Sequence, residues 1–248
     1  MSLFDIFKRR MRPPYEIVEM AVANILSESF DTEYIKDNFS SLINRIQEEA
    51  YRVYLDEQKE NGQISIKEFF TSIIPADASK EESISVVASR FEEFDKFYLS
   101  IAQSRKSRAG KAFEDIIKTL FKRLDYPFDE QQVINGKPDF LMPNREHYDR
   151  NPMDCIIFTA KRTVRERWRQ IVTEGTRGLG FYLATIDKKI TSSQLNEMLR
   201  NRIYLVVPAE IKIVIPYYSA ASNVLSFEEF FEHHLDPALS RWQNSGII

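Results

Sequence analysis

The chain has 248 residues, of which 43% are hydrophobic and 29% are charged, a composition that is ordinary for a globular protein with a sizeable core. Its apolar runs are too short to cross a bilayer, its first residues do not have the charge order of a secretory signal, and its single cysteine excludes an intramolecular disulfide. We therefore expect a protein of the reducing cytoplasm with no membrane partner.

The charged residues are unevenly distributed, although the net charge is only −3. The segment 105–123 holds seven basic and two acidic residues, and the segment 161–177 holds six basic and two acidic residues. The local field over a cleft matters more for nucleic-acid binding than the summed charge does. An acidic chain with two such segments can therefore still bind DNA.

Residues 1–100 are predicted to be mostly helical, and the roles open to this region are to hold a dimer together, to contact DNA, or to regulate access. Apolar side chains recur at helical spacing, and Ser79 with Glu82 has the spacing of a capping box that begins a helix. The Asn-Gly-Gln sequence at 61–63 predicts a turn, and the apolar stretch after it fits either a strand or a helix. The helices predicted here run over about 14–28, 40–57 and 79–102.

Residues 101–248 are predicted to form an α/β unit around a central sheet. The helix at 107–124 has a continuous apolar face, and the Asn135-Gly136 pair predicts a hairpin turn between two short strands. Strands then alternate with helices, which is typical of helices layered on a sheet. The predicted strands are 131–134, 138–142, 155–160, 181–185 and 203–208, and the further helices are 164–178, 191–201 and two short ones around Pro237.

Three charged residues indicate a chemistry. Asp139 opens one predicted strand, Lys161 closes the next, and Glu174 follows on a predicted helix. A hairpin would bring Lys161 beside Asp139, and the helix would return Glu174 to the same end of the sheet. Two carboxylates can hold a hard divalent cation, and a lysine can hold a phosphate oxygen or polarise a water. Together they are the minimum equipment for metal-assisted phosphodiester hydrolysis.

Each of these residues also has an ordinary structural interpretation when it is taken alone. Asp139 could cap a strand, Lys161 could mark the point where a buried strand meets water, and Glu174 could be a solvated helix residue. The functional interpretation therefore rests on the combination of the three.

The segment after Lys161 carries side chains that are suited to reading base pairs. Arg165 and Arg167 match the major-groove edge of guanine, and Glu166 can accept from the cytosine amino group. The segment therefore fits a reader of G·C pairs. The alternative is a helix surface with ion pairs four residues apart, and Trp168 is better interpreted as a core anchor than as a stacking platform.

These motifs resemble those of a known group of enzymes. The Pro-Asp pair at 138–139, the block T-A-K-R-T-x-R-E-R-W-R-Q that begins at Thr159, and the downstream Glu174 resemble the type II restriction endonucleases of the EcoRII and PspGI group, within the PD-(D/E)XK nuclease superfamily. The segment around Glu114 resembles the helix that precedes their catalytic core. Thr159 stands where the superfamily has the acid of its (D/E)-x-K pattern, and in this group the following helix supplies that carboxylate, which Glu174 matches.

The resemblance covers roughly residues 100–240 and implies an α/β fold whose PD-(D/E)XK core, at 101–248, has a mixed central sheet flanked by helices. It implies that Asp139 and Glu174 bind Mg²⁺. It implies that Lys161 positions or helps to deprotonate the attacking water, and that Glu114 holds a second metal or a ligating water.

The resemblance also implies a homodimer that cuts double-stranded DNA at CCWGG or CCNGG, with a cognate DNA methyltransferase as its functional partner. Arg105 and Arg108 would contact DNA together with the segment at 165–167. A pocket for a flipped central base would use Phe69, Phe70 and Arg105, although core packing explains the two phenylalanines and a phosphate contact explains the arginine. The central base, the scissile bond, the number of metal ions and the need for an effector site stay open.

Two other functions are compatible with the sequence. One is a PD-(D/E)XK repair or recombination nuclease that recognises DNA structure instead of sequence. The other is a DNA-binding module that kept the fold and lost catalysis. The presence of Asp139, Lys161 and Glu174 together argues against the second alternative, because a decayed site usually loses one of its three residues.

Overall fold

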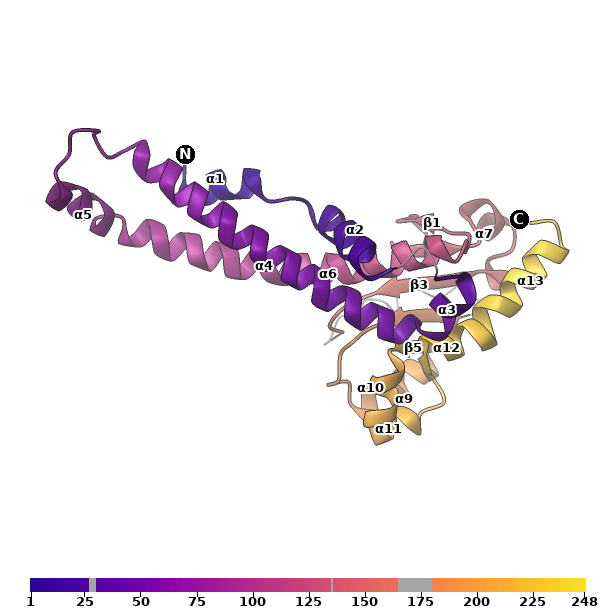
Figure 1. Ribbon diagram of the computed structural model, residues 1–248. Helices are drawn as coiled ribbons and strands as arrows, with labels where there is room; N and C mark the ends of the chain where they lie inside the picture. The colour runs from indigo at the N-terminus through magenta and orange to yellow at the C-terminus, as the bar shows by residue number, and fades with distance from the viewer. Residues whose placement is uncertain (27–29, 135, 165–179) are drawn as a thin grey trace.

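A six-stranded mixed sheet forms the centre of the computed structural model, which describes residues 1–26, 30–134, 136–164 and 180–248 (Figure 1). The strands lie in the order of the sequence; β1 to β3 are antiparallel, and β3 to β6 are parallel. The strands are β1 (Asp129–Glu130), β2 (Phe140–Met142), β3 (Ile156–Ala160), β4 (Gly180–Ala184), β5 (Ile203–Val207) and β6 (Val224–Ser226).

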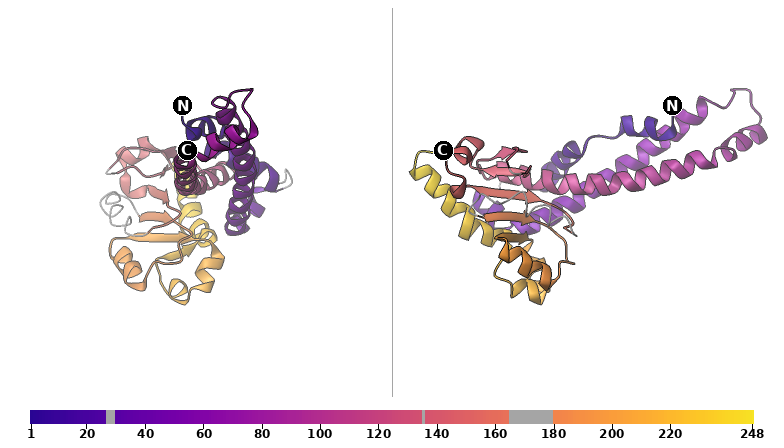
Figure 2. Two further views of the ribbon diagram at one scale, coloured as in Figure 1. Left: turned by 90° about the vertical axis from the view of Figure 1, so that its left-hand side faces the viewer. Right: turned by 180° about the vertical axis from the view of Figure 1, so that it is seen from behind.

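The N-terminal part is helical, as predicted. Its two longest helices have 33 residues each, about 50 Å at 1.5 Å per residue. They run side by side from the sheet to a distant tip that carries α5 (Figures 1 and 2). The helices are α1 (Leu3–Arg10), α2 (Pro14–Ile25), α3 (Thr32–Asp37), α4 (Phe39–Thr71), α5 (Lys80–Ala88) and α6 (Phe91–Arg123).

The remaining helices follow the strands. They are short, and the last three form one nearly continuous helical segment that ends the chain. They are α7 (Arg145–Arg150), the 3₁₀ turn η1 (Pro152–Asp154), α9 (Ser192–Arg200), α10 (Ala209–Val214), α11 (Pro216–Ser219), α12 (Phe227–Phe230), the π-helical turn η3 (Phe231–Leu235) and α13 (Asp236–Asn244).

Side chains alternate along the strands, so the sheet has two cores. On one face α4, α6, α12 and α13 pack against the strands, and Phe121 of α6 lies at the centre, with its ring centroid 5.3 Å from Phe158 and 5.7 Å from Phe140. On the other face α9, α10 and α11 cover a smaller cluster that includes Leu183 and Leu205. The sheet therefore lies between two helical layers, as the sequence predicts.

The predicted turn at 61–63 is wrong, because α4 passes through it without a break. Gly62 costs about 1 kcal/mol in a helix interior, but the buried residues Ser65, Phe69 and Phe70 continue the packed face of the helix beyond it. Asn61 adds a side-chain hydrogen bond to the carbonyl oxygen of Arg10. Tertiary packing therefore outweighs the local turn signal.

Several predicted boundaries also differ. The capping box of Ser79 and Glu82 is confirmed, but its helix ends at Ala88. The helix expected from 107 begins at Phe91, so the proposed boundary between 100 and 101 lies inside α6. The first strand is at 129–130, and Gln131 ends it with a positive φ of 54°. The sequence patterns did not predict β6, which has only three residues.

The helix expected at 191–201 is confirmed as α9, which begins after the capping residue Thr191. Apart from Val164, the helix expected at 164–178 falls on residues outside the described ranges, as does Asn135 of the hairpin turn. Among the helices of the described ranges, none combines the length and the apolar character that crossing a bilayer requires.

Candidate active site

Asp139 and Lys161 meet at one end of the sheet. Asp139 directly precedes β2 and Lys161 directly follows β3, and these two strands are antiparallel, with Phe140 opposite Phe158. The start of one strand therefore lies beside the end of the other. The expected pairing of the two residues is present, with Lys161 Nζ 2.9 Å from Asp139 Oδ2.

The Asp139 carboxylate is buried, with 4% of the residue exposed. Its Oδ2 atom accepts from Thr159 Oγ1 at 2.7 Å, from the backbone N–H of Ala160 at 2.8 Å and from Lys161 Nζ. Thr159, which stands where the superfamily pattern has an acid, thus holds the carboxylate of Asp139. Three hydrogen-bond donors fix Oδ2, and none of these three contacts Oδ1, the other oxygen of the carboxylate.

Glu114 of α6 approaches the same site. The side-chain amide of Gln131 donates to Asp139 Oδ1 at 3.1 Å and lies 3.4 Å from Glu114 Oε1. Glu114 Oε1 also accepts from Lys111 Nζ at 2.6 Å. Burial, followed by the negative charge of Asp139, raises the pKa of the Glu114 carboxyl. The structure thus brings Glu114, Asp139 and Lys161 together.

A second acidic residue lies behind Glu114. Asp115 is 3% exposed, and its Oδ1 lies 3.3 Å from Lys111 Nζ. Its Oδ2 is buried and has no hydrogen-bond partner among the described residues. Burial raises the pKa of this carboxyl. The sequence analysis did not single out Gln131, Lys111 or Asp115; the four-residue spacing of Lys111 and Asp115 on a helix was the available signal.

The donor chemistry of the site fits a hard divalent cation. Asp139 Oδ1 and the Glu114 carboxylate are hard oxygen donors that face a common amide, and such oxygens are the ligands that Mg²⁺ and Ca²⁺ take. Within the described ranges, no cluster of three or more His, Cys, Asp or Glu side chains could hold a metal ion. Glu174, Arg165, Glu166 and Arg167 lie outside the described residues.

The two arginines expected on DNA lie on α6 but differ in their contacts. Arg105 Nε donates to Gln58 of α4 at 2.9 Å. Arg108 donates to the carbonyl oxygen of Arg12 at 2.7 Å, and its guanidinium lies 5.7 Å from the ring centroid of Tyr54. Arg105 therefore links α6 to α4, and Arg108 links α6 to the segment between α1 and α2.

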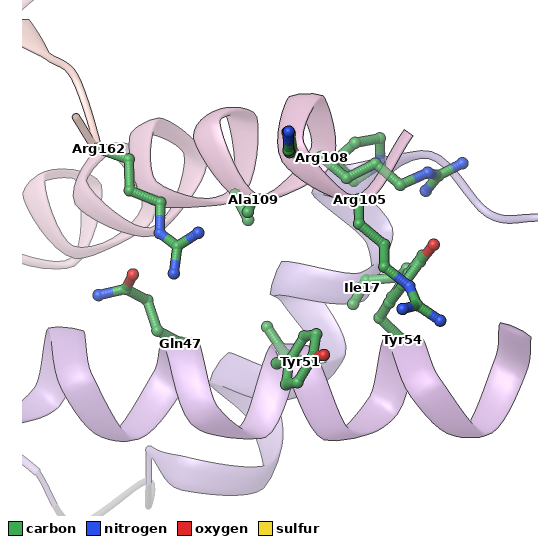
Figure 3. A pocket seen from close by; sticks show the side chains of 12 residues that line it. Ile17, Gln47, Tyr51, Tyr54, Arg105, Arg108, Ala109 and Arg162 are labelled. Carbon is green, nitrogen blue, oxygen red and sulfur yellow. The ribbon is translucent and has the colours of Figure 1, made fainter. Parts of the chain in front are cut away.

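A pocket of about 340 Å³ opens between α2, α4 and α6. Figure 3 shows the side chain of Arg162, the residue that follows Lys161, reaching across the pocket toward Gln47 of α4. Tyr51 of α4 and Arg105 of α6 line the pocket farther from Arg162. The described residues that line it are Pro14, Ile17, Gln47, Ala50, Tyr51, Tyr54, Arg105, Lys106, Arg108, Ala109, Ala112 and Arg162.

Phe69 and Phe70, the expected pocket phenylalanines, are absent from this described lining. Both are buried near the other end of α4, and the ring of Phe70 stacks on Phe94 at 5.5 Å. They have the core role that the sequence analysis gave as the alternative. Arg105 is the one residue of the expected trio that lines the pocket.

The chain is similar to one known protein family and to two type II restriction enzymes. The family described as EcoRII C terminal matches residues 76–231. The type II restriction enzyme SsoII of Shigella sonnei is 26% identical over 93% of this chain and 79% of its own length. The type II restriction enzyme EcoRII of Escherichia coli is 31% identical over 52% of this chain and only 34% of its own length.

Solved structures give the same assignment. Metal-depleted Ecl18kI in complex with uncleaved DNA has a TM-score of 0.79 and 26% identity, over 98% of this chain and 84% of that one. The complex of restriction endonuclease PspGI with substrate DNA has a TM-score of 0.69 at 22% identity, over 95% of this chain and 96% of that one, and supports the fold alone. The expected fold class and enzyme group are confirmed. The chain therefore belongs to the EcoRII C-terminal family of type II restriction endonucleases, which are site-specific deoxyribonucleases.

Proposed function

We propose that this endonuclease cuts both strands of duplex DNA at a short site flanked by G·C pairs, with Mg²⁺ as its cofactor. The observation that carries the proposal is the carboxylate of Asp139. Its Oδ2 is fixed by three donors, one of them Lys161, while its Oδ1 accepts from the Gln131 amide that also contacts Glu114 Oε1. Oδ1 is therefore oriented by the fold, and beside this hydrogen bond it keeps a lone pair that a cation could use.

Asp139 and Glu174 are the proposed metal ligands, and Glu114 holds a second metal or a water that ligates one. When bound, Mg²⁺ supplies Lewis acidity and lowers the pKa of an attacking water. Asp139 orients this centre because its own rotation is blocked by Thr159 and Ala160. Glu114 is proposed to contribute from α6, a different element, so that cation binding joins the helix to the sheet.

Lys161 is proposed to hold a nonbridging phosphate oxygen and to position the attacking water. Its side chain is 35% exposed, so its ammonium is within reach of a substrate, whereas Asp139 beneath it is buried. The ammonium can donate both to the carboxylate and to a phosphate oxygen on which charge develops. In this proposal Lys161 acts at the reacting phosphate without a large movement of its side chain.

The sequence specificity is proposed to come from Arg165, Glu166 and Arg167, which would read the outer G·C pairs of CCWGG or CCNGG in the major groove. Support comes from their position in the sequence, four to six residues after Lys161. Arg105 and Arg108 are proposed to leave their present partners on α4 and on the chain at Arg12 for DNA phosphates. A near-palindromic site further implies a homodimer, with one active site for each strand.

The pocket between α4 and α6 is proposed to receive a base flipped from the centre of the site. Flipping costs a few kcal/mol and needs planar or aromatic surfaces together with hydrogen-bonding groups. Tyr51 and the guanidinium of Arg162 supply planar surfaces, and Gln47 supplies an amide (Figure 3). Arg162 directly follows Lys161 in the chain, so one residue that lines the pocket is the neighbour of the proposed catalytic lysine.

Such an enzyme would also cut the DNA of its own cell unless those sites were modified. We therefore propose that it functions together with a DNA methyltransferase that modifies the same sequence.

The proposal is tested with duplex oligonucleotides that carry CCWGG, CCNGG or a version with scrambled outer pairs, incubated with Mg²⁺ or with a chelator. Cleavage of the CCWGG duplex is expected, alone or together with a CCNGG duplex whose central pair is G·C, and it should be lost with the chelator and with scrambled outer pairs. Cleavage that follows DNA ends or branches would indicate a repair nuclease instead. Sequence-specific binding without any cleavage would indicate a binding module.

Base flipping is tested separately with 2-aminopurine at the central position. We expect its fluorescence to rise when the wild-type protein binds, and to rise much less with Tyr51→Ala. Equal fluorescence of free and bound duplex would contradict the flipping proposal and leave the nuclease proposal intact.

A further inference from the structure

Gln131 has an unusual place between the two described carboxylates of the site. Its side-chain N–H₂ donates to Asp139 Oδ1 at 3.1 Å and lies 3.4 Å from Glu114 Oε1. Among the described residues it is the one side chain with a hydrogen bond to both acids. The amide therefore links the acid that precedes β2 to an acid of α6.

The backbone holds Gln131 in this position. Its φ of 54° lies in the left-handed region, which a residue other than glycine adopts uncommonly. Its N–H donates to the carbonyl oxygen of Asp139 at 3.2 Å, so the main chain and the side chain of Gln131 are both attached to the same aspartate. The neighbouring Gln132 has no such role, because its amide donates to the carbonyl oxygen of Glu130.

We propose that Gln131 is a positioning residue of the reaction, which sets the separation and orientation of the Asp139 and Glu114 carboxylates for a divalent cation. This inference rests on the proposed function. It adds a residue that no acidic or basic motif contains and that does not itself carry charge.

Two carboxylates that face each other repel, and without a cation each would turn toward solvent or toward other donors. Lys111 competes for Glu114, because its Nζ forms a 2.6 Å ion pair with the same Oε1 atom that the Gln131 amide contacts. A neutral donor between the carboxylates holds both oxygens inward without cancelling either negative charge, so the site keeps its attraction for a cation. A lysine in the same place would neutralise the site, and an apolar side chain would leave it unrestrained.

The main test compares Gln131→Met with wild type. Methionine keeps an unbranched side chain of similar length but has no N–H donor. The matched control is Gln132→Met, and Gln131→Asn keeps the amide while tolerating positive φ. Calcium ion, a hard cation with oxygen ligands, is titrated calorimetrically into the complex of each protein with a CCWGG duplex. Cleavage is then measured with Mg²⁺ under single-turnover conditions.

For Gln131→Met we expect calcium affinity to fall by about tenfold or more, the range seen when an outer partner of a ligating side chain is removed. The cleavage rate should fall as well, with the affinity for duplex unchanged. Gln131→Asn should recover part of both losses, and Gln132→Met should behave as wild type. Calcium affinity in Gln131→Met equal to that of wild type, or an equal loss in Gln132→Met, would overturn the inference.

A second variant covers the case in which Gln131→Met does not fold. Gln131→Lys places a fixed positive charge between the carboxylates, so it should abolish calcium binding while raising the unfolding temperature of the cation-free protein. Unaltered calcium binding in this variant would also overturn the inference. If the wild-type complex itself neither binds calcium nor cleaves with Mg²⁺, the proposed function fails and the inference fails with it; if the wild type does both, the variants test the inference alone.

Discussion

Replacing Asp139 by asparagine separates the catalytic role of this residue from its structural role. Asparagine has the same shape, but it has one oxygen and one N–H₂ group where aspartate has two oxygens. Thr159, Ala160 and Lys161 all donate to the same side of the carboxylate, so the asparagine oxygen must face them. Its N–H₂ group then faces the N–H₂ group of Gln131, donor against donor.

The structural cost follows from these contacts. One lost hydrogen bond and one buried donor without a partner cost about 1–3 kcal/mol. Loss of the negative charge next to Glu114 offsets part of this cost, because the charge of Asp139 raises the pKa of Glu114. We therefore expect a destabilisation of about 1–2 kcal/mol, or roughly 2–8 °C in Tm for a chain of this size.

The catalytic cost should be much larger. A metal ion supplies several kcal/mol of transition-state stabilisation, and each 1.36 kcal/mol is tenfold in rate, so loss of this ligand should slow cleavage by about a thousandfold or more. DNA affinity without a cation should be unchanged or higher, since a negative charge near phosphate has been removed.

The assay combines single-turnover cleavage of a labelled duplex, binding of the same duplex in a chelator, and thermal unfolding. The predicted pattern is a folded protein that binds and does not cut. Asp139→Asn cleaving within tenfold of the wild-type rate would remove Asp139 from the metal site and refute this reasoning.

Two further predictions concern stability. Phe121→Ala should lower the free energy of unfolding by about 3–5 kcal/mol, measured by urea titration, because a fully buried ring at the centre of the larger core is lost; a loss below about 1 kcal/mol would mean that the core closes over the site. Asp115→Asn tests a pH effect: burial raises the pKa of Asp115, so the folded state binds this proton more tightly and wild-type stability falls as pH rises through that range. The free energy of unfolding of the variant, relative to wild type, should therefore increase from about pH 4 to pH 7. A difference that does not change with pH would contradict the claim that burial raises the pKa of Asp115.

Much of the sheet was predictable, because each of the strands β2 to β5 is an apolar run bounded by turn-forming or charged residues. The pairing of Asp139 with Lys161 was predictable for the same reason, since antiparallel neighbours bring the start of one strand beside the end of the next. Features that depend on distant contacts were not predictable. The passage of α4 through Gly62 depends on packing, and β6 is only three residues long.

The second layer of the site shows the same limit. Gln131 lies between two acids because its backbone has a positive φ and because α6 brings Glu114 across from another part of the chain. The amino-acid composition around residue 131 indicates neither of these conditions. The pocket lined by Tyr51 and Arg162 joins segments more than a hundred residues apart, so the sequence analysis looked instead to Phe69 and Phe70, which α4 turns into the core.

The most direct test of the central claim is a plasmid digest with Mg²⁺, followed by sequencing of the fragment ends. The claim is that a cation held by Asp139, Glu174 and Glu114, with Lys161 beside it, cuts both strands at one short sequence. It predicts discrete fragments whose ends all fall within one motif with outer G·C pairs, and no fragments when a chelator replaces Mg²⁺. Unspecific degradation would contradict the proposed base readers, and an intact plasmid that carries CCWGG and CCNGG sites would contradict the proposed active site.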